Sequence, residues 1–138
     1  ITLPDGLTSV GAELFLGDKE LKEVTLPSGL TAVSDSMFSG CTALQSIDLP
    51  DTVAYIGESA FSGCTALTDI TFPAGLEGFG KKAMYYCISL PEITVPAGVR
   101  TLAEGVFNGC SKASSIRRLT FLTAWSPSAV WRSAVCTF

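Results

Sequence analysis

The chain repeats one 23-residue unit five times without insertion or deletion. Each unit opens with a strand-like tetrapeptide, and these tetrapeptides (ITLP, VTLP, IDLP, ITFP and ITVP) begin at Ile1, Val24, Ile47, Ile70 and Ile93. A unit this short cannot bury an apolar face alone, so neighbouring units must stack to form a core. The repeat predicts a solenoid over residues 1–115. Residues 116–138 lose the pattern and are predicted to be a degenerate sixth repeat or a C-terminal cap.

Apolar residues recur at fixed places in every unit, so each place should form one layer of a continuous core. Alternate residues of a strand point to opposite faces, which puts Ile47 inward and Asp48 outward. In the third unit the predicted inward residues are Ile47, Leu49, Val53, Ile56, Phe61, Cys64 and Leu67.

A proline ends each strand-like segment, since proline cannot donate a ladder hydrogen bond. Successive strands joined by a crossover run parallel. We therefore expect an α/β solenoid with a parallel sheet on one face. Short helices and turns, such as the segment 57–63 that ends in glycine, should form the other face.

The unit LPxxLxxIGxxAFxxCxxLxxI resembles the BspA-like class of leucine-rich repeats. The residues that carry the resemblance are Leu49, Pro50, Val53, Ile56, Gly57, Ala60, Phe61, Cys64, Leu67 and Ile70. The resemblance covers residues 1 to about 115. It implies a right-handed solenoid with a concave sheet, in cell-surface or secreted proteins of bacteria and some parasitic protists that contact host or neighbouring-cell proteins. Asp18 departs from the pattern in place of cysteine, and Met84 and Tyr86 replace the usual Phe and Gly.

Four cysteines occupy one place of the repeat, and they are Cys41, Cys64, Cys87 and Cys110. Free cysteine behaves as a small buried hydrophobe, so we predict that these thiols pack in the core. Disulfides between adjacent units are the alternative, because neighbouring strands lie within disulfide range. Zinc sites use closely spaced pairs such as CxxC, and the column shows none. Cys136 lies outside the column.

Composition argues against several classes of function. The sequence has no histidine, which removes the commonest general base and metal ligand. Asp48 and Asp69 lie on neighbouring strands, but an open sheet offers no closed pocket to desolvate them. A net charge of −4 without a basic run disfavours nucleic acid. We expect no enzymatic activity, no cofactor and no metal. Pro127 and Arg132 interrupt the apolar segment 119–138, so no membrane insertion is expected.

The outward side of the sheet is the main candidate binding surface. It forms an acidic, hydroxyl-rich stripe made of Glu23, Thr25, Ser46, Asp48, Asp69, Thr71, Glu92 and Thr94, continued by Thr2, Ser115 and Arg117. Closely spaced carboxylates attract a basic or cation-bearing partner. The other interpretation is that a strand face in water needs only polar residues, and threonine suits strands.

Tyrosines provide a weaker second candidate. Tyr85 and Tyr86 replace the Ser-Gly or Asn-Gly of other units, beside Lys81 and Lys82, and Tyr55 is a further exposed aromatic candidate. Amphipathic tyrosines on a turn are typical contact residues. They would equally cover a gap left where phenylalanine became methionine, and both interpretations stay open.

The sequence predicts a noncatalytic, adhesion-type protein-binding module of a surface or secreted protein, whose partner is an extracellular or host protein. A structural spacer of a larger surface protein is the alternative. The predicted location is extracellular or the cell surface. Self-association is expected through Ile1 to Pro4, because this edge strand has no preceding strand to cover it.

Overall fold

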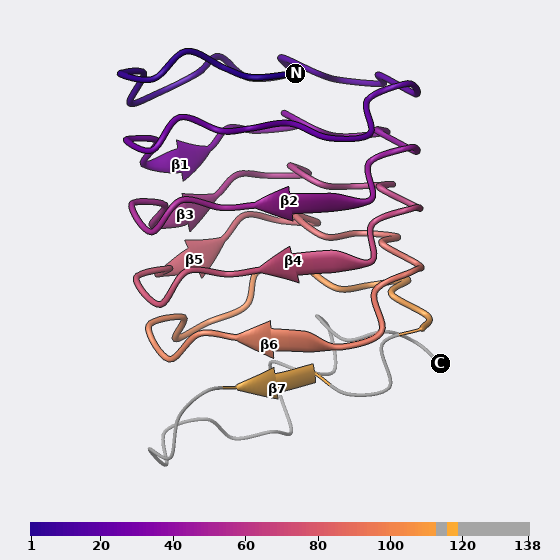
Figure 1. Ribbon diagram of the computed structural model, residues 1–138. Helices are drawn as coiled ribbons and strands as arrows, with labels where there is room; N and C mark the ends of the chain where they lie inside the picture. Colours follow the sequence, from indigo (N-terminus) through magenta and orange to yellow (C-terminus); the bar gives the residue numbers. More distant parts are fainter. Residues whose placement is uncertain (113–115, 119–138) are drawn as a thin grey trace.

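The computed structural model describes residues 1–112 and 116–118. Each 23-residue unit forms one rung, and the rungs stack in sequence order, as Figure 1 shows. The seven strands are β1 (Ala32–Val33), β2 (Ser46–Asp48), β3 (Tyr55–Ile56), β4 (Asp69–Thr71), β5 (Gly78–Phe79), β6 (Ile93–Val95) and β7 (Ile116–Arg118). All strand pairs are parallel, which confirms the predicted stacking of parallel strands.

The front sheet is formed by the strand-like tetrapeptide region of each rung. β2 pairs with β4, β6 pairs with β7, and a bridge joins Thr2 to Thr25. The expected continuous ladder is interrupted in the described residues, since β2 does not pair with the second rung and β4 does not pair with β6. Strands of three residues bounded by proline offer few ladder bonds, so losing the ladder at one interface costs little.

A second parallel sheet, of order β1-β3-β5, lies behind the front sheet in Figure 1 and was not predicted. Its register pairs Val33 with Ile56 and Ile56 with Phe79, so one core column supplies all three strands. Backbone hydrogen bonds continue this sheet just beyond the strands. For example, the Gly57 N–H donates to the Val33 carbonyl at 2.8 Å.

The predicted short helices are wrong, because the described residues contain no helix. Along each turn segment, every second backbone N–H donates to a carbonyl of the next rung. The N–H groups between them donate to the carbonyl three residues earlier in the same rung. The Phe38 N–H donates to the Ala60 carbonyl at 2.8 Å, whereas the Cys41 N–H donates to the Phe38 carbonyl at 3.1 Å. Ser36 also has a left-handed φ of 52°. An α-helix requires donation four residues back throughout, so hydrogen bonding between rungs replaces it.

The core runs the length of the array between the two sheets and the turns. All seven residues predicted to be inward in the third unit are buried, which confirms the register. The rings of Phe15, Phe38 and Phe61 stack with centroids 5.5 and 5.2 Å apart. The first rung differs, since Leu7 is exposed there although its column is buried in later rungs. Its outer side has no neighbouring rung in the structure to cover it.

The strand that opens the sixth unit stays in the register of the repeat, because Ile93 pairs with Ile116 at the 23-residue spacing. The interpretation of residues 116–138 as a degenerate repeat or cap otherwise falls outside the described residues, as do Cys136 and the membrane argument on 119–138. Within the described part of the chain, no helix is available to cross a membrane.

Candidate binding site

The outward side of the front sheet, here called the sheet face, carries the stripe predicted from the sequence. Glu23, Thr25, Ser46, Asp48, Asp69, Thr71 and Glu92 are exposed, and Thr94 is half-buried. The register places Ser46 beside Asp69 and Asp48 beside Thr71. Thr2 is exposed at the top of the same face, whereas Ser115 and the Arg117 side chain lie outside the described residues. The structure thus brings these predicted residues onto one surface.

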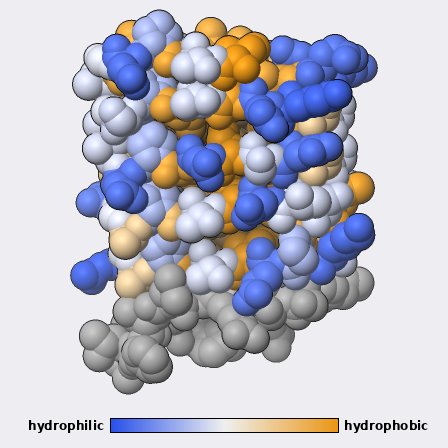
Figure 2. Space-filling view, viewed as in Figure 1, coloured by the Kyte–Doolittle hydropathy of each residue, from blue (hydrophilic) through white to orange (hydrophobic). Residues whose placement is uncertain are grey.

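Two hollows open on the sheet face where the ladder is interrupted. One, of about 270 Å³, lies between the second and third rungs, and the other, of about 310 Å³, lies between the fourth and fifth. The first is lined by Val24, Thr25, Leu26, Ser28, Asp48, Leu49 and Pro50, and the second by Ile70, Thr71, Phe72, Glu92 and Thr94. Figure 2 shows hydrophobic residues between the hydrophilic residues of this face. Each hollow therefore combines apolar lining with hydroxyls and one carboxylate.

Three acidic side chains of the sheet face have no neighbouring cation in the part of the chain that the structure describes. Within residues 1–112, no ion pair involves Glu23, Asp48 or Asp69. The ion pair that joins Lys81 to Glu104 at 3.7 Å belongs to the turn segments. The field of the sheet face is consequently negative, and it favours the approach of positive charge.

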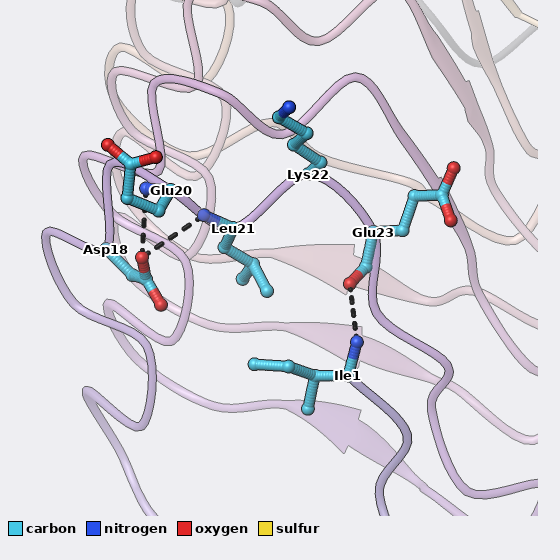
Figure 3. A pocket seen from close by; sticks show the side chains of 6 residues that line it. All are labelled: Ile1, Asp18, Glu20, Leu21, Lys22 and Glu23. Carbon is cyan, nitrogen blue, oxygen red and sulfur yellow. Dashed lines mark hydrogen bonds between the residues drawn. The ribbon is translucent and has the colours of Figure 1, made fainter.

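A third hollow, of about 490 Å³, lies at the first rung (Figure 3). Some of its polar groups are engaged locally, since Asp18 Oδ1 accepts the N–H groups of Glu20 and Leu21 at 3.0 and 3.1 Å. The amino group of Ile1 donates to the Glu23 carbonyl at 3.1 Å. Asp18 occupies the cysteine place of this rung, so its carboxylate organises the following turn and its departure from the pattern has a structural explanation.

The four cysteines of the column are free and buried, as predicted, and no disulfide joins them. Burial raises the pKa of Cys41 to about 11, and it also raises the pKa of Cys64 and of Cys87 well above the ordinary value of a thiol. A thiolate is the nucleophile and the metal ligand, so these thiols are chemically unreactive. No group of three or more metal-ligating side chains is present in the part of the chain that the structure describes.

The tyrosines lie away from the sheet face. Tyr55 is on β3 in the second sheet, and a Cβ added to Gly78 would lie 3.3 Å from its ring. Tyr85 and Tyr86 lie in the turn segment of the fourth rung, with ring centroids 4.6 Å apart. Met84 is fully buried beside them in sequence. The structure therefore places the tyrosines apart from the sheet face.

A family model described as the BspA type leucine rich repeat region matches residues 1–114 in six copies. The chain belongs to this leucine-rich-repeat family. No curated protein matches the chain. The repeat array is thus a module of a kind found in bacterial leucine-rich-repeat proteins, as the following crystal structures show.

Solved bacterial structures share the fold. The chain is 31% identical to a T. pallidum leucine-rich repeat protein, with a TM-score of 0.81 over 84% of this chain and 54% of that one. It is 29% identical to a leucine-rich repeat protein from Bacteroides ovatus, with a TM-score of 0.76 over 85% of this chain and 33% of that one. A leucine rich cell surface protein from Faecalibacterium prausnitzii shows the fold at 21% identity, with a TM-score of 0.55 over 96% of this chain and 49% of that one. The chain spans about a third to about half of these proteins.

Proposed function

We propose that this repeat array is a noncatalytic protein-binding module of a bacterial surface or secreted protein, and that it acts in adhesion. The observation that carries the proposal is the set of carboxylates on the sheet face, Glu23, Asp48, Asp69 and Glu92, beside hollows with apolar lining. Long-range attraction brings a basic partner to the face, and the hollows then accept parts of its side chains. The partner is an extracellular or host protein.

Two further observations support parts of this proposal. The raised pKa of the column thiols and the lack of histidine support a noncatalytic role, because both remove common nucleophiles and bases. The Faecalibacterium neighbour, a cell surface protein, supports an extracellular or cell-surface location.

Charge reversal tests the binding role. Replacing Glu23, Asp48, Asp69 and Glu92 together by Lys should slow association with a basic extracellular protein far more than it speeds dissociation. Binding kinetics on immobilised extracellular-matrix and cell-surface proteins measure both rates, with circular dichroism as the check of folding. If the variant associates with and dissociates from a confirmed partner at the same rates as the native array, the sheet face is only a solvated surface.

A structural spacer is the second candidate function. The phenylalanine stack from Phe15 to Phe61 and the continuous buried core favour it, since a stiff array holds another domain at a fixed distance. A spacer would tolerate the charge reversal and would fail only when the core is disrupted.

A further inference from the structure

The fourth rung carries a bulky side chain at a backbone position where the other four rungs that the structure describes have glycine. Gly17, Gly40, Gly63 and Gly109 have φ values of 71°, 75°, 73° and 81° at this place of the turn segment. Tyr86 occupies the same place with φ at 57°. A left-handed backbone is unfavourable for any residue with a Cβ, so Tyr86 is held in a strained conformation.

The strain at Tyr86 is not a general requirement of the turn. The residue four positions earlier, Lys82, also has a positive φ, but so does its equivalent in each rung. Those equivalents are Glu13, Ser36, Ser59 and Gly105. The backbone is left-handed at the places of both Lys82 and Tyr86 in each described rung. At the place of Tyr86, the other described rungs have glycine, which adopts this conformation without strain. Tyr86 therefore departs from the other described rungs at the second place, and its side chain is the feature that the fourth rung adds there.

The Tyr86 ring lies across the backbone of the next rung. A Cβ added to Gly109 would lie 2.9, 3.0 and 3.1 Å from Cδ2, Cγ and Cε2 of the ring, so the bare glycine provides the surface on which the ring rests. The residue is nevertheless 50% exposed. The Tyr85 ring stands beside it, tilted by 59°. The exposed Tyr86 ring, here called the aromatic platform, thus has the Tyr85 ring along one side.

Polar groups surround this platform. The Lys82 Nζ lies 5.6 Å from the centroid of the Tyr85 ring. Within the described ranges, Lys82 forms no ion pair, and neither tyrosine hydroxyl has a hydrogen-bond partner. Lys81, in contrast, is paired with Glu104. One ammonium group and two phenol hydroxyls are consequently available beside an exposed aromatic ring.

We propose that Tyr85, Tyr86 and Lys82 form a second binding site, which takes an acidic saccharide. A pyranose ring has a flat apolar C–H face that fits the exposed Tyr86 ring, and its hydroxyls fit the phenols, which join an apolar body to a polar tip. A carboxylate on the sugar pairs with the Lys82 ammonium group through a charge-assisted hydrogen bond. An acidic peptide would satisfy Lys82 but would leave the aromatic platform uncovered, so the saccharide fits the whole site better.

The test uses the full chain with an oligogalacturonide as the acidic probe and a neutral galacto-oligosaccharide of the same length. Saturation-transfer NMR and calorimetry should show at least about tenfold tighter binding of the acidic probe. Tyr86→Gly should lose binding at least about tenfold while the melting temperature stays the same or rises, because glycine is the residue of the other rungs. Lys82→Gln should lower affinity for the acidic probe toward that for the neutral one. Lys19→Gln, at an exposed lysine of the first rung, should leave binding unchanged.

Four results would overturn the site. The native chain would show no binding of the oligogalacturonide, or Tyr86→Gly would bind it normally. A poly-glutamate peptide that binds as tightly as the saccharide, with no loss in Tyr85→Ala or Tyr86→Gly, would indicate a charge contact alone. A large fall in melting temperature in Tyr86→Gly, with binding kept in Tyr85→Ala, would show that the ring only covers Gly109.

Discussion

The thiol of Cys64 donates a hydrogen bond to the backbone carbonyl of Phe38 in the preceding rung, at 3.1 Å. The same carbonyl accepts the N–H of Cys41 within its own rung, also at 3.1 Å. Equivalent thiol bonds join Cys41 to Phe15, Cys87 to Phe61 and Cys110 to Met84. The repeated cysteine thus fills the core and satisfies a backbone acceptor between rungs, which explains its place in the unit.

Burial of this column predicts slow thiol chemistry. Cys41, Cys64, Cys87 and Cys110 should react slowly with a thiol reagent in the native protein, because their side chains are fully buried. All of them should react after denaturation without reductant. Mass spectrometry after alkylation counts the labelled sites. Missing labels on the denatured chain would show that disulfides between rungs form in solution.

The raised pKa of the column thiols predicts a loss of stability in alkali. The pKa of a thiol in the unfolded chain is about 9. In the folded protein, burial raises the pKa of Cys41 to about 11 and raises the pKa of Cys64 above that value. Between these values the unfolded state binds fewer protons, so the free energy of unfolding falls as pH rises from about 9. Urea titrations across this range measure it. A Cys64→Ala, Cys87→Ala variant should show a shallower fall, and an equal slope would assign the effect to other groups.

The phenylalanine stack predicts where the array is most sensitive to truncation. Phe61→Ala should lower the free energy of unfolding by about 3 to 5 kcal/mol, because it removes a fully buried ring that stacks on Phe38. Phe15→Ala, in the same column of the partly exposed first rung, should cost less. Urea denaturation compares the two variants. A loss below about 1 kcal/mol for Phe61→Ala would contradict the 23-residue register.

Close contact between rungs predicts a position-specific effect of one methyl group. A Cβ at Gly57 would lie 2.5 Å from Asp35 Oδ1 and 2.6 Å from the Asp35 backbone nitrogen. Gly57→Ala should therefore destabilise the fold by about 1 to 3 kcal/mol through overpacking. Gly11→Ala is the matched control, because Gly11 occupies the same place in the first rung with no atom within 4 Å of the added Cβ. Thermal unfolding compares them, and equal melting temperatures would refute the close approach.

The register of the repeat was predictable because the apolar residues of each core column recur every 23 residues in the sequence. Phe38 and Phe61 occupy equal places in neighbouring units, and stacking is the arrangement that buries both. The turn segment was predicted less well. Its compact sequence ending in glycine suits a helix, but at Phe38 the N–H bonds to the Ala60 carbonyl of the next rung instead. That competition between local and inter-rung hydrogen bonds depends on a neighbouring unit, and no single segment reveals it.

The sheet face was predictable from alternation alone, since Ser46 and Asp48 flank the inward Ile47 and the structure exposes both. The hollows were not predictable, because they depend on which neighbouring rungs lack strand pairing on the sheet face. The signal at Tyr86 was present in the sequence as a tyrosine in a column of glycines. Its left-handed backbone and its contact with Gly109 needed the structure.

The negative field of the sheet face predicts a salt-dependent encounter with positive charge. A short oligolysine peptide should bind the native array, and neutralising the face with Glu23→Gln, Asp48→Asn, Asp69→Asn and Glu92→Gln should slow its association about tenfold at low salt. Added salt should remove the difference, because screening shortens the reach of exposed charges. The matched control changes Glu13, Glu58, Glu77 and Glu104 to Gln, which removes the same charge from the exposed turn and second-sheet sides. Stopped-flow fluorescence measures the rates, and equal slowing by both variants would show that net charge acts without any contribution from the sheet face.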